Sequence, residues 1–158
     1  LLALTESITR AELESRQDQQ TLEMLQGIFP EANFYIFDEG TEIYKMYNNG
    51  RNEIGYAFYA QGRGWGGNIV ILVGLEDKET IKGIVVVSQY ETTYIWDKLI
   101  KNNFFDQLNG LRIEDCALKK RYGGGGGQVD GITGATVSSE AVVDIVREAA
   151  LEKVKTIR

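Results

Sequence analysis

The sequence predicts an α+β fold in which an antiparallel sheet is flanked by N-terminal, middle and C-terminal helices. Five strand-like runs follow one another between residues 34 and 88, with helical patterns before and after them. Turns of two or three residues, such as Asn48-Asn49-Gly50, separate several of these runs, and turns this short join antiparallel neighbours. At 158 residues the chain has about the length of one domain, and it can bury a core without disulfides or metal.

The N-terminal part of the chain divides into an arm and the start of the domain. We expect residues 1–20 to form an exposed helical arm and residues 21–158 to form the folded domain. The helical pattern begins at about Thr5 and ends before Pro30, the only proline. Leu1-Leu2-Ala3-Leu4 is far shorter than the roughly 20 apolar residues that span a bilayer. It is either the stub that follows a removed membrane anchor or the start of an amphipathic helix.

The strand-like runs are rich in aromatic and β-branched residues, which favour extended structure. A weaker strand is expected over Cys116–Lys119. In chain order, the five main runs are Phe34–Phe37, Glu42–Tyr47, Ile54–Gln61, Asn68–Gly74 and Ile81–Ser88.

Two further helices are expected after the strands. The middle one covers about Tyr94–Leu108, with Ile95, Leu99 and Ile100 on one side. The last one, about Val137–Lys155, has the clearest apolar stripe at helical spacing. Its stripe comprises Val142, Ile145, Val146, Ala149 and Val154.

The composition excludes several classes of site. There is no His, which removes His-based triads and His-ligated zinc or haem. Cys116 is the only Cys, so the chain alone forms neither a disulfide nor a four-cysteine iron–sulfur site, and we interpret it as a small buried hydrophobe. Lys and Arg number 17 against 23 Asp and Glu, a net charge of -6 with no basic block, which argues against a nucleic-acid partner. We expect no catalytic residue and no metal site.

Glycine is the unusual feature of the composition. The chain has 18 glycines, whereas average usage of about 7% predicts roughly 11. Four lie between Gly62 and Gly67, and seven more lie between Gly123 and Gly134. Concentrated glycine marks backbone that turns sharply or approaches another group closely, so we expect function in these two segments.

The second segment leads into the last helix and suits an anion. The free N–H groups and the positive dipole end of a first helical turn favour phosphate. Hydroxyls of Thr133, Thr136, Ser138 and Ser139 fall within seven residues, next to Gly134. The alternative is a hydroxyl-rich N-cap with no ligand, but a helix needs only one capping hydroxyl.

This segment resembles the flavinylation motif of the FMN-binding domain family. The family's order is Asp, two variable residues, Ser or Thr, Gly, Ala, and Ser or Thr, which matches Asp130, Thr133, Gly134, Ala135 and Thr136 here. The resemblance implies that Thr136 carries FMN through a phosphoester bond. Asp130 would help the attaching enzyme to dock or order the loop, or it is only a turn residue.

Two other segments resemble the same family. Gly64, Trp65 and Gly66 look like its glycine–aromatic loop, which would place Trp65 against the flavin ring. Glu91 and Thr92 look like the Glu-Thr step of Rnf-type members, which would contact the polar edge of the ring. Without the family resemblance, Trp65 is interpreted as a core residue of a tight hairpin, and Glu91 is interpreted as a solvated carboxylate at a strand end. After Thr92 the chain departs from the family's Pro-Gly-Leu-Gly, which suggests an aromatic wall in place of a glycine-lined one.

The resemblance implies an electron-transfer role with covalent FMN. It points to one subunit of a membrane-bound, ion-translocating oxidoreductase complex, similar to the G subunit of the Rnf complex and related to the C subunit of the sodium-pumping NADH:quinone reductase. A separate flavin transferase would attach the FMN, so recombinant protein made without it can lack flavin. The domain would lie outside the cytoplasm on a single N-terminal anchor in the cell membrane, with other subunits as partners and no turnover of its own.

Two other functions remain open from the residues. One is a non-redox phosphate-ligand-binding or sensor domain of the same fold, whose ligand would wash out on denaturation. The other is a phosphate-ester hydrolase, which is disfavoured because no base or metal cluster is evident unless Asp130 and Glu91 converge.

Overall fold

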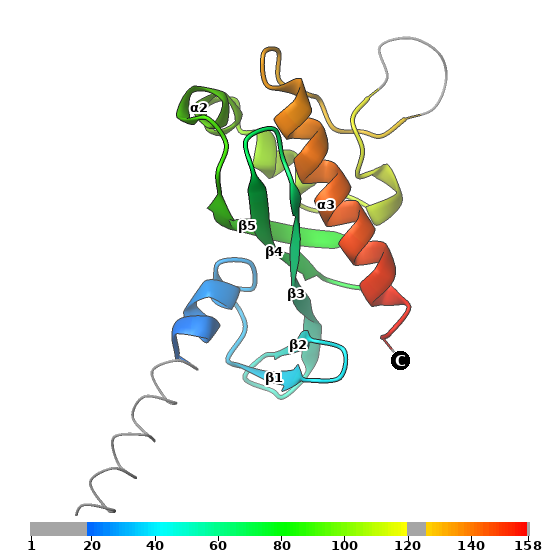
Figure 1. Cartoon of the computed structure of the whole chain (residues 1–158). Helices are drawn as coiled ribbons and strands as arrows, with labels where there is room; N and C mark the ends of the chain where they lie inside the picture. Colours follow the sequence, from blue (N-terminus) through cyan, green and yellow to red (C-terminus); the bar gives the residue numbers. More distant parts are fainter. Residues whose placement is uncertain (1–18, 120–125, 158) are drawn as a thin grey trace, which may run out of the picture.

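The structure, a computed structural model, describes residues 19–119 and 126–157. Its centre is a five-stranded sheet in which every neighbouring pair is antiparallel and the spatial order is the chain order, β1-β2-β3-β4-β5 (Figure 1). This arrangement confirms the predicted fold class. The strands are β1 (Phe34–Asp38), β2 (Ile43–Tyr47), β3 (Glu53–Arg63), β4 (Asn68–Leu75) and β5 (Ile81–Gln89).

In chain order, helices precede and follow the strands of the sheet. A helical segment over residues 19–26 precedes β1, and the predicted arm with Leu1–Leu4 lies outside the described residues. No helix within the described part of the chain is long and apolar enough to cross a membrane. After the sheet come α2 (Thr93–Lys101), the short 3-10 helices η1 (Phe104–Leu108) and η2 (Ile113–Asp115), and α3 (Thr136–Val154).

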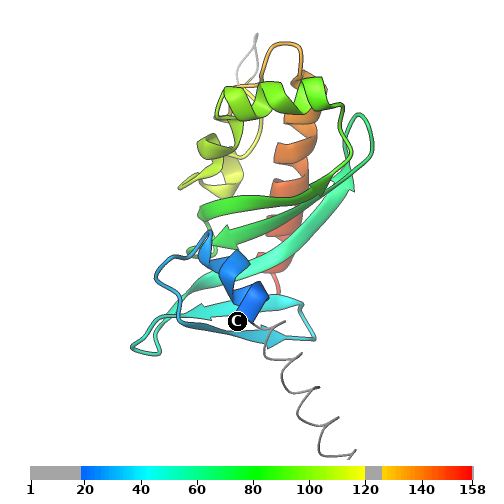
Figure 2. The ribbon, with the colours of Figure 1, turned by 90° about the vertical axis from the view of Figure 1, so that its left-hand side faces the viewer.

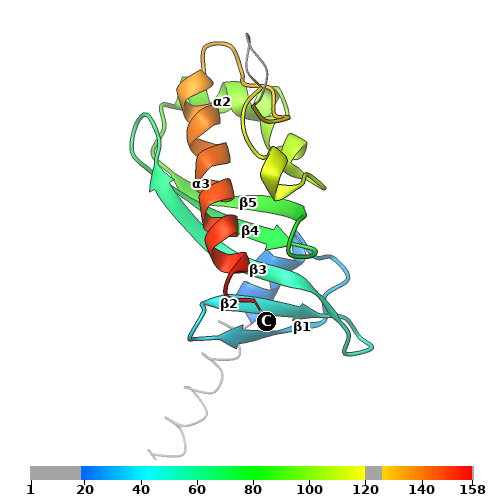
Figure 3. The same cartoon turned by 90° about the vertical axis from the view of Figure 1, so that its right-hand side faces the viewer.

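The sheet separates two apolar clusters. Side chains alternate between the faces of a strand, so Ile71 and Val73 of β4 pack toward α3, whereas Leu72 packs with the residues around the N-terminal helix. α3 crosses one face of the sheet, and the N-terminal helical segment lies on the other side (Figures 2 and 3). The predicted apolar stripe is confirmed, since Val142, Ile145 and Val146 are buried. Both faces of the central strands are therefore covered.

The middle helix is shorter than the sequence predicts. α2 ends at Lys101, and Asn103 takes a left-handed conformation with φ 52° before the 3-10 helix η1 begins. The break turns the chain back over the sheet. The predicted inward face is also wrong in part, because Ile100 is exposed while Trp96 and Leu99 are buried.

The predicted strand over Cys116–Lys119 is wrong. This segment makes only isolated bridges, a parallel one between Leu118 and Val129 and an antiparallel one between Lys119 and Gly126. Val129 N–H donates to the carbonyl of Ala117 at 3.0 Å. The two sides of the loop thus pair locally, without joining the main sheet.

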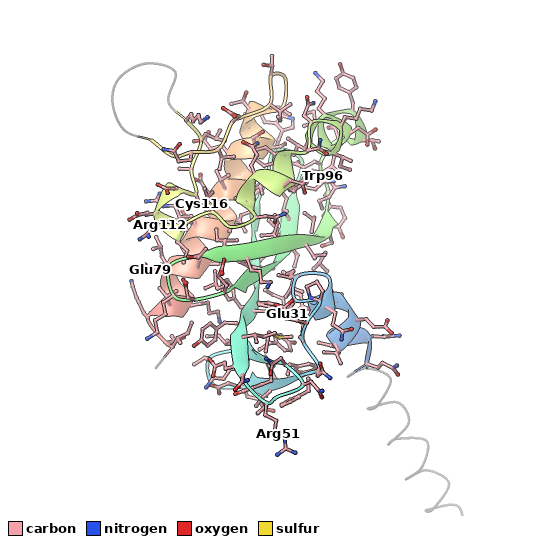
Figure 4. All side chains as sticks on the ribbon, turned by 180° about the vertical axis from the view of Figure 1, so that it is seen from behind. Glu31, Arg51, Glu79, Trp96, Arg112 and Cys116 are labelled. Carbon is pink, nitrogen blue, oxygen red and sulfur yellow. The ribbon has the colours of Figure 1, made fainter. Side chains whose placement is uncertain are left out.

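Ion pairs join loop residues to the sheet and to one another at the protein surface. Lys82 of β5 lies 2.5 Å from Glu31, and the hydrogen bond it donates lowers the pKa of that carboxyl. Arg112 pairs with Glu79 and with Glu114 beside the start of β5, where Figure 4 labels Arg112 and Glu79 side by side. All these pairs are solvent-exposed, so each adds about 0–1 kcal/mol of stability.

Cys116 is fully buried and is a free thiol, which confirms its interpretation as a small hydrophobe. Its Sγ lies 3.6 Å from the carbonyl oxygen of Val143 in α3 (Cys116 is labelled in Figure 4). Burial raises the pKa of the Cys116 thiol from 9.0 to about 12, with smaller opposing effects from Arg147, which lowers it, and Asp144, which raises it.

The free energy of unfolding is expected to decrease at alkaline pH because of the Cys116 thiol. Above about pH 9 the unfolded chain loses the thiol proton while the folded chain keeps it to about pH 12, so the contribution is complete below pH 9 and lost between these values. The loss is about 1.4 kcal/mol per pH unit. Urea unfolding at pH 8–10.5 measures it, with Cys116→Ala as the control that should show a shallower slope. Equal slopes for the two proteins would contradict the expectation.

Candidate functional site

The candidate site is centred on the first turn of α3. The chain reaches this helix through Gly134, whose φ of +83° suits glycine, and Ala135 is the N-cap. No side chain caps the helix, so the hydroxyl-rich N-cap anticipated as the alternative is absent here. No acidic residue occupies the first turn either. The amides of this turn are therefore left for an anion.

Thr136, the first residue of α3, is exposed to solvent, and so is Thr133. The two serines that follow are not. Ser138 and Ser139 are 1% and 0% exposed, and both hydroxyls bond within the protein. Ser139 Oγ donates to the carbonyl of Ala135 at 2.8 Å, and Ser138 Oγ donates to Glu91 at 2.8 Å. Of the hydroxyls at this turn, the structure leaves Thr136 and Thr133 accessible to a reactant.

An apolar pocket of about 370 Å³ adjoins Thr136. This volume lies within the usual range for small-molecule sites, about 300–1,000 Å³. Its wall combines the loop before α3 with side chains from α2 and from the β3–β4 turn. The lining residues are Trp65, Ile95, Gly134, Ala135, Thr136, Val137 and Ser138.

A second, more polar pocket of about 500 Å³ lies on another side of Thr136. Asp130 lines it and pairs with Lys119 at 3.2 Å, which fixes the carboxylate at the rim. The backbone of Asp130 is held as well, because its N–H and C=O both bond the amide side chain of Gln107. The other lining residues are Leu118, Gly131, Thr133 and Gly134.

The glycine–aromatic loop forms the turn between β3 and β4. Gly64 N–H donates to the carbonyl of Gly67 at 2.7 Å and closes the turn. Trp65 lies at the tip of this turn and is 65% exposed, so the interpretation of Trp65 as a core residue is wrong. Trp96 is the buried tryptophan, packed against Phe105 with ring centroids 5.2 Å apart. Trp65 instead offers an open indole face beside Thr136.

Glu91 lies beneath this loop and is only 7% exposed. The interpretation of Glu91 as a solvated carboxylate is therefore wrong. Glu91 Oε1 accepts from Trp65 N–H at 2.7 Å, and Oε2 accepts from Gly66 N–H. Thr92, next in the chain, is exposed at the N-cap of α2, where its side chain makes no capping bond. Neither Glu91 nor Thr92 lines the two pockets described above.

The segment after Thr92, which departs from the family pattern, does not line the apolar pocket with the expected aromatic residue. Tyr94 is exposed on α2, with Lys98 Nζ 4.5 Å from its ring centroid. Ile95, not an aromatic residue, lines the apolar pocket. Lys98 also reaches the loop before α3, because a Cβ built on Gly134 would lie close to its Nζ.

Sequence reasoning missed several residues that line the two pockets. Ile95 was expected to face the core, and Val137 was seen only as the start of a helix. Lys119 lies four residues before the polyglycine run and had no signal of its own, since its pairing with Asp130 depends on how the loop closes. In the described residues, no group of three or more Cys, Asp or Glu side chains could hold a metal ion, and Asp130 and Glu91 have separate partners.

The arrangement suits a ligand with an anionic group and a flat apolar body. The pocket is lined both by the exposed Thr136 at the uncapped start of α3 and by the apolar side chains of Trp65 and Ile95. A deep-lying Thr136 without a cavity would have been incompatible with such a ligand. The residues present therefore fit a nucleotide-like flavin with its phosphate at α3.

Comparison with known proteins agrees with this fit. The family described as FMN-binding domain matches residues 64–151. A protein from Methanosarcina acetivorans, named as the G subunit of an ion-translocating oxidoreductase complex, is 34% identical over 160 residues, covering 94% of this chain and 83% of the relative. The protein of the same name from Vibrio cholerae is 27% identical and covers 94% of this chain and 80% of its own length.

Two solved structures share the fold. The C subunit of the Na(+)-translocating NADH-quinone reductase from Parabacteroides distasonis gives a TM-score of 0.58 at 24% identity, over 73% of this chain and 63% of that one. NqrC from Shewanella oneidensis gives 0.57 at 19% identity, over 80% and 73%. With the family match over residues 64–151 and the relative that is 34% identical, these findings show that the chain belongs to the FMN-binding domain family.

Proposed function

We propose that this chain is the FMN-bearing electron-carrier subunit of an Rnf-type, ion-translocating oxidoreductase complex. The observation that carries the proposal is the exposed hydroxyl of Thr136 at an uncapped helix start, with an apolar pocket of about 370 Å³ beside it. The 34% identity to a relative named as the G subunit of such a complex supports the same role.

In this proposal FMN is attached covalently, and Thr136 Oγ supplies the oxygen of the phosphoester. A threonine hydroxyl is a weak nucleophile without a neighbouring base. The chain has no His, and the nearby hydroxyls of Ser138 and Ser139 are committed to bonds inside the protein. A separate flavin transferase would therefore supply the base. The family resemblance implies that it uses a divalent metal and FAD, whose FMN part would pass to Thr136 Oγ while AMP leaves.

The chain's own residues would hold the group at both ends. Amides of the first turn of α3 would face the phosphate, as helix starts do in other phosphate sites. Trp65, Ile95 and Val137 would face the isoalloxazine ring from around the apolar pocket. Asp130 and Thr133, at the polar pocket, would order the loop for the transferase. Bound FMN supplies the redox chemistry, while the protein contributes position and electrostatics.

The magnitude of a covalent tether suits a domain outside the cytoplasm, where free FMN is scarce. If free FMN is nanomolar and the tether gives a millimolar effective concentration, the ratio of about a million is worth roughly 8 kcal/mol. The helix dipole alone contributes about 0.3–2 kcal/mol. We therefore propose an extracytoplasmic domain, anchored at its N-terminus in the cell membrane and working beside other subunits of the complex.

Intact mass under denaturing conditions tests the proposed function. The chain is co-expressed with an active flavin transferase and unfolded before measurement. We expect a gain of one FMN minus one water, because a phosphoester survives denaturation while a reversible ligand washes out. An unmodified chain, beside a known substrate that the same transferase has modified, would falsify the covalent assignment.

Trp65→Ala is expected to alter the flavin environment without preventing attachment. Loss of the indole removes one wall of the apolar pocket, so the visible spectrum and the midpoint potential of the flavin should shift. Spectroscopy and a redox titration of the flavinylated protein measure both. Tyr90→Ala is the matched control, because Tyr90 is equally exposed but does not line the apolar pocket. Values unchanged from the wild type would remove Trp65 from the site.

A further inference from the structure

We infer that Glu91 is a positioning residue, which fixes the Trp65 loop and the first turn of α3 relative to each other. This inference rests on the proposed function, since the two parts it joins are the two walls of the proposed flavin pocket. The carboxylate would act through Trp65 and Ser138, with no direct contact to the ring.

The contacts of Glu91 reach both walls. Oε1 accepts from Trp65 N–H at 2.7 Å and from Ser138 Oγ at 2.8 Å, and Oε2 accepts from Gly66 N–H. Glu91 N–H itself donates to Gln89 Oε1 at 2.7 Å, which anchors the residue at the end of β5. Hydrogen bonds to an ionised acceptor are about twice as strong as neutral ones. The carboxylate thus links the β3–β4 turn to α3, and the backbone N–H of the same residue ties both to the end of β5.

The burial of the carboxylate makes this linkage rigid. A buried charge is tolerated when hydrogen bonds replace its hydration, and here three donors from the β3–β4 turn and α3 do so. Ser138 lines the apolar pocket, so the carboxylate lies one hydrogen bond behind the pocket wall. A shift of Glu91 would move Trp65 and α3 together.

Close approach to Glu91 and to the residue before it accounts for the glycines of the loop. A Cβ on Gly64 would lie 2.1 Å from Glu91 Oε1, and a Cβ on Gly66 would lie 2.5 Å from the carbonyl oxygen of Tyr90 and 2.9 Å from Glu91 Oε2. Real Cβ contacts are never so short, so the loop can approach the carboxylate only with glycine at these positions. The glycine–aromatic loop and the Glu-Thr step, which are about 25 residues apart in the sequence, therefore form one structural unit.

The test uses four proteins and two measurements. The proteins are the wild type, Glu91→Gln, Ser138→Ala and the matched control Glu140→Gln, which changes an exposed glutamate on α3. The first measurement is amide hydrogen exchange of Trp65 and Gly66 in the full chain without flavin. The second is the visible circular dichroism and midpoint potential of the flavin after attachment.

Each variant has a distinct expected result. In the wild type and Glu140→Gln, the amides of Trp65 and Gly66 exchange slowly. In Glu91→Gln at least one of them exchanges roughly 10- to 100-fold faster, because the single amide oxygen accepts from at most two of the three donors. Ser138→Ala keeps both amides protected but loosens α3, so it changes only the flavin signals. Glu91→Gln changes the flavin signals as well.

Two outcomes overturn the inference. One is protection of both amides in Glu91→Gln equal to that in Glu140→Gln. The other is flavin dichroism and potential in Glu91→Gln and Ser138→Ala equal to those of the control. If the wild type takes up no flavin, the proposed function fails, while the exchange rates still decide whether Glu91 holds the loop. If Glu91→Gln does not fold, fast exchange of the two amides in the wild type overturns the inference by itself.

Discussion

Thr136→Ala is expected to abolish covalent FMN attachment completely. The substitution removes the oxygen that the phosphoester requires, and no other exposed hydroxyl stands at the first residue of α3. After co-expression with the transferase and denaturation, the variant should keep its unmodified mass while the wild type gains one FMN minus one water. The fold should be unaffected, because Thr136 is exposed and caps nothing, and such changes cost about 0.5 kcal/mol or less.

Thr93→Ala is the matched control for this experiment. Thr93 is also an exposed threonine at the first residue of a helix, α2, but it lines neither pocket beside Thr136. It should still be flavinylated, and Thr136→Ser should retain attachment because it keeps a hydroxyl. A gain of FMN in Thr136→Ala, or its loss in Thr93→Ala alone, would contradict attachment at Thr136.

Gly127→Ala is expected to give a large loss of stability. A Cβ at this position would lie 1.9 Å from the carbonyl oxygen of Ala117 and 2.5 Å from its Cα, so the backbone itself would have to move. Gly127 N–H also donates to the carbonyl of Leu118 at 3.1 Å, and the displacement would break this bond. Overpacking of this kind costs about 3 kcal/mol, which lowers the melting temperature by about 10 °C.

Gly131→Ala provides the comparison. Its Cβ would meet only the flexible end of Leu118, at 3.4 Å, which is an ordinary contact. Thermal unfolding followed by circular dichroism should place this variant within about 2 °C of the wild type. Because both glycines belong to the loop that carries Asp130, equal melting temperatures for the two variants would show that the loop does not need its close approach at Gly127.

The sequence predicted the sheet well because its signals are local. Alternating and β-branched runs separated by short turns located all five strands and their antiparallel order. The break in the middle helix at the left-handed Asn103 was missed, although Asn adopts this conformation more readily than most residues. The segment at Cys116 has strand-like residues, but its partners close a loop and do not extend the sheet.

The candidate site was only partly predictable for a different reason. Thr136 and the helix start follow from a contiguous motif, so sequence reasoning places them together. The role of Glu91 depends on residues far away in the chain, Trp65 and Ser138, that meet only after the sheet has formed. In the same way, Ser138 and Ser139 look like ligand donors in the sequence, but burial turns their hydroxyls inward.

The helical segment over residues 19–26 and the start of α3, whose first residue is Thr136, lie on different sides of the sheet and toward opposite ends of the molecule (Figures 1 and 2). A partner that grips the N-terminal segment therefore does not compete for space with one that approaches Thr136. Under the proposed function, the domain can stay fastened within a larger assembly and still meet an electron donor and an electron acceptor in turn.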